Sequence, residues 1–363
     1  TPKTSGIKGI TLYEPGALTI VAKSGTPLAE INKALASENQ GLPFEPGDYS
    51  GLFGTKGKST IGGVVGAAVS GPRRIQTGAC RDSLIGVRFV DGEGTIIKNG
   101  GRVMKNVTGY DLVKLMAGSY GTLGVLSEVS FKVLPRPEMT GVVLLHGLDD
   151  ETASIAMAKA LSSPFDISGA AHLSLGSNDI PLTMIRVEGF TGSIKYRTWK
   201  LKELLAGILP AKAEISIELD QTKAQDLWKL VRDVEPFHGS SSDVWRLSVK
   251  PGDGWKIVET LHKNMETKTL YDWGGGLVWL EAETNGDNAK SNAEAIRSAV
   301  NAVGGHATLI RSNAPHSEVD AFHPEHPRVA QISQQLRHQF DPKSILNPGR
   351  MAHVQQSRSM VGA

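Results

Sequence analysis

The sequence predicts an α+β protein with more than one domain, on three observations. A chain of 363 residues is long enough for two or three domains of the usual ~150 residues. Hydrophobic residues make up 40% of the chain and charged residues 21%, which is enough for a buried core. Strand-like and helix-like segments alternate, and beyond residue 137 they do so in two rounds, which indicates an antiparallel sheet covered by helices.

The first part of the chain combines short strands with one clear helix. The β-branched stretch "LTIVAKS" is typical of a strand. Pro27 stands where a helix start tolerates proline, Leu28, Ile31 and Leu35 fall on one face, and Gly41 is the expected stop. The stretch "LIGVRFVDGEGTIIKNGG" predicts a hairpin with glycine and acid at its turn.

A domain boundary is expected at the sequence Pro-Arg-Pro of residues 135–137. These prolines end the strand-like run "VLSEVSFKVL", and all ten histidines of the chain lie downstream, beginning with His146. We therefore expect one domain at residues 1–137 and a second one that begins at residue 138.

The elements expected after the boundary follow one another regularly. Strands are predicted at "MTGVVLLH", "AAHLSL", "LTMIRVEGF", "DVWRLSVK", "GLVWLEAE" and "HATLIR", and helices at Asp150 to about Leu161, "YRTWKLKELLAGI", "AQDLWKLVRDV", "GWKIVETLHKN" and "NAEAIRSAVNAV". A last helix places Val329, Ile332, Leu336 and Phe340 on one face and ends at Asp341-Pro342.

Composition excludes several classes of function. The formal net charge is only +2, which argues against nucleic acid as the main partner. Cys80 is the one cysteine, so the chain cannot form an internal disulfide, a zinc knuckle or a cysteine-held iron–sulfur cluster. Redox chemistry would need an organic cofactor or another subunit. No run approaches the ~18 apolar residues of a membrane span, and no signal peptide is expected.

Residues 51–63, "GLFGTKGKSTIGG", look like a nucleotide phosphate loop but do not match its spacing. A Walker loop needs glycine five positions before the Gly-Lys pair, and Leu52 stands there. The glycines at 62, 63, 66 and 71 also disfavour the well-formed helix that should follow. The dinucleotide fingerprint fails too, because "GSYGTLG" spaces its glycines three apart.

Two glycine-dense stretches, 54–71 and 118–124, are nevertheless candidates for binding an anion. Backbone amides in such turns form a concave nest that suits a pyrophosphate, and hydroxyls and cations lie near them in sequence. The alternative is that the glycines serve turns and tight packing. The hydroxyl and cation candidates are Ser59, Thr60, Ser119, Thr122, Arg73, Arg74, Arg81 and Lys105.

Several longer motifs carry a resemblance. "VMKNVTGYDLVKLMAGSYGTLGVLSEVSFKVLPRP", with "STIGG", "SGPRR", "CRDSLIG", "DWGGGLVWL" and "FDPKSILNPGRM", resembles the FAD-binding domain of the vanillyl-alcohol-oxidase (PCMH) type of FAD-linked oxidases. Within that family the chain is most similar to the smaller of the FAD-binding subunits of bacterial glycolate oxidases. The resemblance implies a PCMH-type FAD-binding domain at residues 1–137, a ferredoxin-like α+β cap at 138–325, and a C-terminal segment at 326–363 that returns to the first domain.

The resemblance also implies which residues lie against FAD, with residues 57–63 facing its pyrophosphate or flavin. Lys105 is a candidate for the flavin side, with a solvated surface lysine as the alternative. Asp82 and Asp111 are expected mainly to hold loops through backbone amides. The implied FAD-binding residues are Pro46, Gly47, Asp48, Ser59, Thr60, Ile61, Gly62, Gly63, Arg73, Gly78, Asp82, Lys105, Gly109, Tyr110, Gly118, Ser119, Gly121, Thr122, Gly124, Val125 and Asn347.

The chain departs from the family pattern in two places. The family's first pyrophosphate loop lies before the segment matching "LTIVAKSGTPL", and "TPKTSGIKGI" does not contain it, so we expect a trimmed chain or half of an FAD site. Catalytic relatives carry a histidine-rich "HxGDGNxH"-like stretch in the cap, where this chain has "DWGGGLVWL" with Asp272 as its acid. No histidine is offered there as a base, so no catalytic residue is assigned.

The downstream histidines and tryptophans have simpler interpretations. His323 and His326 lie three apart beside Glu325, with His316 and Glu318 upstream, but Pro324 and Pro327 disfavour a helix, so a polar loop is expected and no metal site. Core packing is expected for the tryptophans, with partner docking for any that is exposed. The tryptophans considered are Trp228, Trp245, Trp255, Trp273 and Trp279.

The expected function is that of an FAD-binding oxidoreductase subunit in a glycolate oxidase complex. Electrons from a 2-hydroxy acid would pass through flavin here or in a sister FAD-linked subunit, then to an iron–sulfur subunit and a quinone. Such a subunit would be cytoplasmic or peripheral at the plasma membrane through the complex. The alternatives are a free-standing FAD-dependent 2-hydroxy-acid dehydrogenase of the D-lactate type, and a scaffold subunit without flavin.

Overall fold

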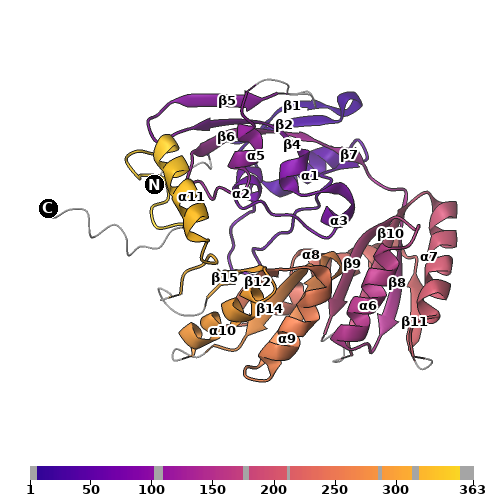
Figure 1. The fold of residues 1–363 in the computed structure, drawn as a ribbon. Coiled ribbons are helices and arrows are strands. Elements are labelled where there is room, and N and C mark those ends of the chain that lie inside the picture. The colour runs from indigo at the N-terminus through magenta and orange to yellow at the C-terminus, as the bar shows by residue number, and fades with distance from the viewer. Residues whose placement is uncertain are drawn as a thin grey trace.

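Two antiparallel sheets stacked with helices between and below them form the molecule. The computed structural model describes residues 6–101, 109–174, 180–210, 213–284, 288–312 and 319–351. Figure 1 shows a five-stranded sheet at the top, a layer of short helices beneath it, and a larger eight-stranded sheet with its own helices at the bottom. This arrangement confirms the predicted α+β class.

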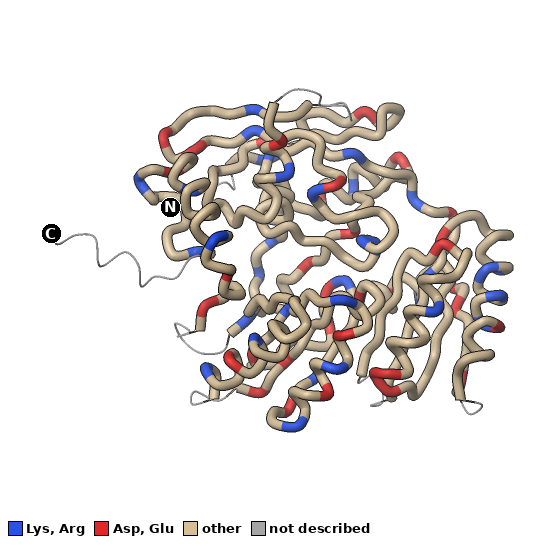
Figure 2. Tube along the Cα trace, in the orientation of Figure 1, with Lys and Arg blue, Asp and Glu red and all other residues tan. Residues whose placement is uncertain are grey.

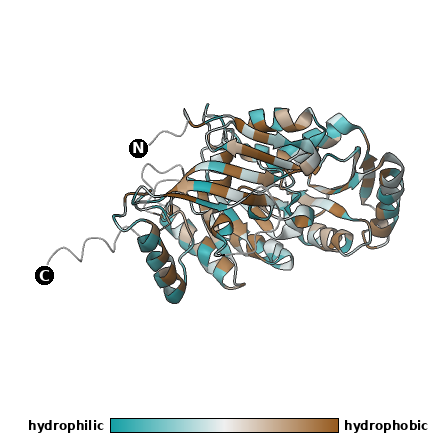
Figure 3. Cartoon of the chain, turned by 90° about the horizontal axis from the view of Figure 1, so that it is seen from above, coloured by the Kyte–Doolittle hydropathy of each residue, from teal (hydrophilic) through white to brown (hydrophobic). Residues whose placement is uncertain are grey.

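The upper sheet has the strand order β1-β2-β6-β4-β5, and every neighbouring pair is antiparallel. Hydrophobic and hydrophilic residues alternate along its strands in Figure 3, because one face packs on the helices and the other does not. The predicted strand "LTIVAKS" and the predicted hairpin are both confirmed. The strands are β1 (Ile10–Glu14), β2 (Thr19–Lys23), β4 (Leu84–Val90), β5 (Ile96–Gly100) and β6 (Val125–Lys132).

Helix α1 (Leu28–Ala36) begins directly after Pro27 and buries Leu28, Ile31 and Leu35, as its spacing predicted. It ends at Ala36, earlier than the predicted stop at Gly41, which instead pairs with Leu134 in a two-stranded ribbon. The remaining short elements of this layer are η2 (Pro15–Ala17), β3 (Gln40–Gly41), α3 (Arg74–Thr77), α4 (Cys80–Ser83), α5 (Leu112–Met116) and β7 (Leu134–Pro135).

The glycine-rich stretch after Thr60 forms a short helix, α2 (Ile61–Gly66), which the sequence argued against. Burial of Ile61, Val64 and Val65 offsets the ~0.5–1 kcal/mol that each interior glycine costs a helix. Gly62 lies directly against strand β2, because a Cβ there would stand 2.6 Å from the Ser24 Cβ. Close packing therefore explains this glycine.

The lower sheet consists of two βαββαβ units with the ferredoxin-like strand order, joined where β9 pairs with β13. The full strand order is β11-β8-β10-β9-β13-β14-β12-β15, all antiparallel. The ferredoxin-like cap is thus confirmed, but β11 and β13 were not predicted. The strands are β8 (Met139–His146), β9 (Ile167–Leu173), β10 (Leu182–Gly189), β11 (Glu214–Glu218), β12 (Asp243–Ser248), β13 (Thr267–Asp272), β14 (Leu277–Ala282) and β15 (His306–Arg311).

Helices cover both faces of this sheet. Four of them bury their apolar residues in one core on the outer face, and α8 (Gln221–Arg232) packs on the face turned toward the upper sheet. In the described part of the chain no helix has both the length and the apolar composition of a membrane span. The outer helices are α6 (Asp150–Leu161), α7 (Thr191–Ala206), α9 (Gly254–His262) and α10 (Ala289–Asn301), and the short 3-10 turns are η4 (Glu235–Phe237), η5 (Pro251–Asp253) and η6 (Trp273–Gly275).

The C-terminal helix α11 (Pro327–Phe340) returns to the upper sheet, at the left of Figure 1. Phe340 packs against Phe89 with ring centroids 6.1 Å apart, and its carbonyl accepts from the Gly92 amide at 2.8 Å. The predicted face is only partly buried: Leu336 and Phe340 are half-buried against the core of the upper sheet, whereas Val329 and Ile332 are 48% and 64% exposed.

A buried ion-pair network joins the two layers. Arg186 on β10 donates to both carboxylate oxygens of Glu45, at 3.0 and 2.9 Å, and its side chain is only 3% exposed. Glu188, two residues along the same strand, pairs with Arg186 at 3.5 Å and with Arg73 of the upper layer. Although burial acts to raise it, the two arginines lower the pKa of Glu188 to about 2.

We expect Arg186→Met to lower the free energy of unfolding by ~3–5 kcal/mol, because it leaves buried carboxylates without their cation. A urea titration measures the change. The control is Lys200→Met, which removes an exposed i,i+3 pair with Glu203 and should cost less than about 0.5 kcal/mol. Equal effects of the two substitutions would show that the buried network does not stabilise the fold.

Candidate functional site

A cavity of about 370 Å³ lies at the junction of the two layers. This volume is in the range of small-molecule sites, roughly 300–1,000 Å³. Its walls come from the loop before α2, from α2 and the residues after it, and from β12, β14 and β15 of the lower sheet. The lining residues are Gly47, Tyr49, Ser50, Phe53, Thr55, Gly57, Lys58, Ser59, Thr60, Gly63, Val64, Ala67, Ala68, Val69, Ser70, Tyr120, Arg246, Trp279, Thr308, Leu309, Ile310, Ala321, Phe322 and Arg350.

Main-chain amides are available along one wall of this cavity. The Leu28 amide donates to the Ser59 carbonyl at 2.8 Å and the Ile61 amide to Thr26 at 2.9 Å, which anchors the end of the loop. Before Ile61, the amides of residues 56–60 donate to no acceptor among the described residues. Unpaired amides on a loop suit an anionic group such as a phosphate.

The charges of the residues that line the cavity also favour an anionic ligand. Lys58, Arg246 and Arg350 line the cavity, and no aspartate or glutamate of the described residues does so. Over the whole chain, by contrast, both signs are interspersed, as Figure 2 shows along the Cα trace. The excess of positive charge is therefore local, and it suits an anionic ligand.

The glycine-dense stretch 118–124 uses its backbone amides to hold α2, so these amides are not available to a ligand. The amides of Gly118 and Tyr120 donate to the carbonyls of Val65 and Gly66 in α2, at 3.0 and 2.8 Å. The Ser119 hydroxyl donates to the carbonyl of Met116 at the end of α5, and the Thr122 hydroxyl donates to the Ser119 carbonyl. The glycine-dense stretches 54–71 and 118–124 do lie side by side. The amides of Gly118 and Tyr120 are, however, already bonded to α2, so the prediction that these two amides bind a ligand is wrong.

Packing accounts for the other predicted residues of this bend. A Cβ on Gly124, just before Val125 begins β6, would stand 2.6 Å from the Phe89 ring. Gly121 lies against Asn347, whose side-chain amide donates to the Tyr120 carbonyl at 2.7 Å. Only Tyr120 of this bend lines the cavity.

The loop at residues 46–48 positions the cavity wall. Pro46 and Gly47 are buried, and Gly47 lines the cavity. Asp48 accepts from the Ser59 hydroxyl at 2.9 Å and from the Ser50 amide at 3.0 Å. Although burial acts to raise it, these hydrogen bonds lower the pKa of Asp48, so the carboxylate holds Ser59 in place.

Other predicted residues lie away from the cavity. Arg73 is committed to Glu188, and Tyr110, next to Gly109, is 88% exposed and does not line the cavity. Asp82 accepts from the Ala79 amide at 2.8 Å beside Gly78, and Asp111 accepts from the Lys114 amide, so both hold loops as expected. Ile61 is a core residue. Lys105 lies outside the described residues.

The lower-sheet wall was not predicted as part of a site. Trp279 meets Tyr49 edge to face with ring centroids 5.5 Å apart, and burial raises the pKa of the Tyr49 hydroxyl. The core packing predicted for Trp279 is confirmed, since it is 2% exposed and belongs to a buried cluster, but its place in the cavity lining was not predicted and Arg246 was not singled out. An arginine in the middle of an apolar strand, as in "DVWRLSVK", was the available signal.

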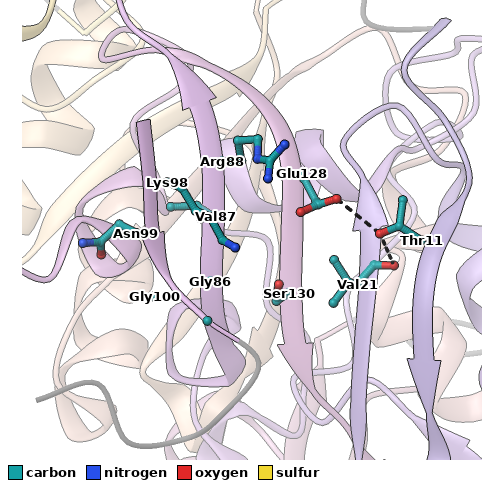
Figure 4. A pocket seen from close by; sticks show the side chains of 11 residues that line it. Thr11, Val21, Gly86, Val87, Arg88, Lys98, Asn99, Gly100, Glu128 and Ser130 are labelled. Atoms are coloured by element: carbon teal, nitrogen blue, oxygen red, sulfur yellow. Dashed lines mark hydrogen bonds between the residues drawn. The ribbon is translucent and has the colours of Figure 1, made fainter. Parts of the chain in front are cut away.

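A second cavity of about 130 Å³ lies on the opposite face of the upper sheet (Figure 4). It is lined by residues that alternate with the core positions, among them Arg88, Lys98 and Glu128. Thr11 donates to Glu128 at 3.2 Å across its floor. Its volume is below the roughly 300 Å³ at which small-molecule sites begin, so it does not compete as a cofactor site.

In the histidine-containing loop before α11, both ring nitrogens of His323 form hydrogen bonds within the protein. The Nδ1 atom of His323 accepts from the Ala307 amide at 3.2 Å, and its Nε2 atom bonds Asn301 at 2.8 Å. In the parts of the chain that the structure describes, no three acidic, histidine or cysteine side chains are grouped to hold a metal. His316 and Glu318 lie outside those parts.

The two-layer fold with a ferredoxin-like cap and a cavity lined by cations between the layers fits the class of flavoproteins that hold FAD between two such layers, and the comparisons with known proteins show this class. A family model described as an FAD binding domain matches residues 3–100. The chain is 36% identical to the glycolate oxidase subunit GlcE of Escherichia coli over 345 residues, covering 95% of this chain and 85% of that protein. The chain therefore belongs to the GlcE-like FAD-linked oxidases, its cofactor is FAD, and it is an oxidoreductase.

The other similarities either cover a smaller part of the chain or have a lower sequence identity. The glycolate oxidase subunit GlcD of Bacillus subtilis is 38% identical over 127 residues, or 35% of this chain and 26% of that protein. Among solved structures, alkyldihydroxyacetonephosphate synthase matches 95% of this chain and 67% of its own, with TM-score 0.65 and 16% identity. A BBE-like protein of Physcomitrella patens matches 94% and 79%, with TM-score 0.63 and 14% identity. These structures support the fold alone.

Asp272, the acid of "DWGGGLVWL", is buried between the layers next to this cavity. Its carboxylate accepts from the Trp273 amide at 2.7 Å. Burial raises the pKa of Asp272 to about 7, against the hydrogen bond and the charge of Arg186, which lower it. The side chain does not line the cavity.

We expect Asp272→Asn to stabilise the protein above pH 7. The folded-state pKa lies above the ordinary value of about 3.9, so the wild type loses stability as the pH rises from about 4 to 7. Asparagine keeps an acceptor for the Trp273 amide without the charge. The variant should be more stable at pH 8 by on the order of 2–4 kcal/mol and similar to wild type near pH 4, as measured by urea unfolding.

The matched control is Asp226→Asn, an exposed change on α8 that should keep the wild-type pH dependence. A destabilised Asp272→Asn variant at pH 8 would mean that Asp272 is needed as a carboxylate.

Proposed function

We propose that this chain is the FAD-binding subunit of a glycolate oxidase complex. The carrying observation is the cavity between the layers, which combines three cations, no lining acid among the described residues and the unpaired amides of residues 56–60. The proposal also draws on the 36% identity to a glycolate oxidase subunit over 95% of the chain. The glycolate oxidase subunit GlcD of Bacillus subtilis is a relative over part of the chain, which fits a sister subunit in one assembly.

FAD supplies an acceptor for two electrons that can be passed on singly. The residues of this chain bind and orient it. The loop amides and Lys58 stabilise its negative charge, and Asp48 fixes the Ser59 hydroxyl at the same wall. Of the residues expected from the resemblance, Gly47, Ser59, Thr60 and Gly63 line the cavity and are proposed as cofactor contacts. Trp279 and Ile310 form an apolar wall that excludes water.

We assign the oxidation of the acid to the sister subunit. No histidine, aspartate or glutamate of the described residues lines the cavity, so the cavity lacks the usual bases for a hydroxyl proton. The chain has one cysteine, Cys80, which is buried, so an iron–sulfur cluster must come from a partner subunit. The complex would pass electrons to a quinone at the inner face of the plasma membrane. We propose the same division of the chain as before, with an FAD domain at residues 1–137, a cap at 138–325 and a C-terminal segment at 326–363, and the presence of two separate sheets supports it.

The alternative of a free-standing hydroxy-acid dehydrogenase is favoured by one observation. Rat mitochondrial D-2-hydroxyglutarate dehydrogenase is 25% identical over 91% of this chain and 65% of that protein. Reduction of a dye by the purified chain with glycolate or D-lactate would select this function.

The test of the proposal is flavin loading. The chain purified from excess FAD should show a flavin band near ~450 nm. Lys58→Glu should weaken FAD retention about tenfold, because it places a negative charge beside the phosphates. Titration of the apoprotein with FAD, followed by flavin fluorescence, measures the difference.

The control is Lys98→Glu, the same charge change on the opposite face of the upper sheet. A colourless wild type, or equal FAD affinity in Lys58→Glu and wild type, would refute FAD binding at this wall.

A further inference from the structure

The lower layer holds the loop that positions one wall of the cavity. The amide of Asp48 in this loop donates to the carboxylate of Asp233 at 2.9 Å, although the two residues are 185 positions apart. Asp233 directly follows α8 of the cap, and it is 6% exposed. The hydrogen bond therefore ties a loop of the upper layer to the buried end of a cap helix.

The carboxylate of Asp233 is itself fixed in orientation. Arg232 donates to both of its oxygens, from Nε at 2.8 Å and from Nη2 at 2.7 Å. The Nε2 atom of His238 bonds the main-chain carbonyl of Asp233 at 3.0 Å. A buried carboxylate with two charge-assisted hydrogen bonds has a defined direction, so Asp233 is a rigid acceptor for the Asp48 amide.

Close packing of the backbone keeps the loop on the cap. A Cβ on Gly47 would collide with the Arg232 carbonyl, and a Cβ on Gly51 would collide with the His238 ring. These two glycines therefore allow the loop to lie directly on residues 232–238. The position of the loop is set by the cap as well as by the upper layer.

From Asp48 the series of hydrogen bonds continues to the wall of the cavity. The Oδ1 atom of Asp48 accepts from the Ser50 amide at 3.0 Å and from the Ser59 hydroxyl at 2.9 Å. Ser59 lines the cavity and stands among the unpaired amides of residues 56–60. Because residues 53–58 are exposed, the hydrogen bond of Ser59 to Asp48 constrains where these amides point.

The helix that carries Asp233 does not account for a carboxylate at this position. Asp233 is the C-terminal cap of α8, where the partial negative charge of a helix end disfavours an acidic side chain. Arg232 offsets this repulsion, but an uncharged residue at the cap would need no such offset. The carboxylate supplies an acceptor for the Asp48 amide, which gives Asp233 a role outside its own helix.

We propose that Asp233 is a positioning residue for the FAD site. It holds Asp48, which in turn holds the Ser59 hydroxyl. The unpaired amides of residues 56–60 are thereby kept directed at the phosphates of FAD. The inference rests on the proposed FAD site, and it adds that the cap sets part of the affinity for the cofactor. Asp233 does not line the cavity, so it acts only through these contacts.

The first experiment measures FAD affinity by titrating the full-length apoprotein with FAD and following flavin fluorescence. Asp233→Ala removes the acceptor and should raise the dissociation constant for FAD about tenfold, because the loop amides lose their fixed direction. Asp233→Asn keeps a side-chain oxygen for the Asp48 amide and should stay within about threefold of wild type. Asp233→Glu keeps the charge but displaces the carboxylate, so it should bind FAD about as weakly as Asp233→Ala.

The matched control is Asp150→Ala, on the face of the cap that is turned away from the upper layer. The Asp150 carboxylate bonds the side chains of His172 at 3.1 Å, of Ser174 at 2.8 Å and of Tyr271. Its removal should lower the stability of the cap but leave the dissociation constant for FAD within about twofold of wild type. This variant separates a general weakening of the cap from an effect on the loop.

A double-mutant cycle tests whether Asp233 acts through Ser59. Asp233→Ala should weaken FAD binding about tenfold when Ser59 is present. In the Ser59→Ala background it should weaken binding less than about twofold, because the last hydrogen bond of the series is already lost. Two residues that act independently would instead show effects that add.

A further experiment needs no flavin. Hydrogen exchange, followed by mass spectrometry, compares the apoprotein of wild type with that of Asp233→Ala. Peptides covering residues 46–60 should exchange at least about threefold faster in the variant, because the loop loses its attachment to the cap. Peptides covering α9 should exchange as in wild type.

The outcomes distinguish this inference from the proposed function. Equal FAD affinity of wild type and Asp233→Ala overturns the inference and leaves the proposed FAD site intact. An equal loss of affinity in Asp150→Ala, an undiminished effect of Asp233→Ala in the Ser59→Ala background, or unchanged exchange of the loop does the same. A wild type that retains no FAD refutes the proposed function and the inference together.

Discussion

The pair between Arg186 and Glu45 is the constraint on which the geometry of the site depends. Glu45 directly precedes the loop that lines the cavity, and Arg186 stands on a strand of the lower sheet. Bidentate hydrogen bonds fix both distance and orientation, so the pair sets the separation of the two cavity walls. The indole of Trp273 donates to the Gly71 carbonyl at 3.0 Å and holds the other side of the same junction.

Local patterns were enough to predict most of the fold. The helix at residues 28–36 and the hairpin at 84–100 follow from apolar spacing and turn chemistry alone. Strand β11 was missed because "EISIE" is a short polar edge strand, and β13 because "TKTLYD" stands next to a stronger helix pattern. Helix α2 was misjudged because its stability comes from burial against the upper sheet, which no local propensity records.

Only the wall of the cavity formed by the loop before α2 was predictable from the sequence. Sequence motifs identified the loop at 57–63, which is continuous in the chain. They could not separate glycines that contact a ligand from glycines that pack, since Gly62 and Gly124 are required by neighbouring side chains. The other wall joins Tyr49 to Trp279, residues more than two hundred positions apart, and such pairing depends on how the layers stack.

The lower sheet contains the same folding unit twice, and the two copies contribute different residues to the junction of the layers and to the cavity. The first copy contributes Arg186 and Glu188 and serves as the anchor to the upper layer. The second contributes Arg246 and Trp279 and forms the wall of the cavity. The second copy also holds the upper layer, through the Trp273 indole on the Gly71 carbonyl and the Arg311 guanidinium on the Leu52 carbonyl. Both copies therefore share the attachment, and a substitution in the second copy can disturb the cavity wall and the junction of the layers together.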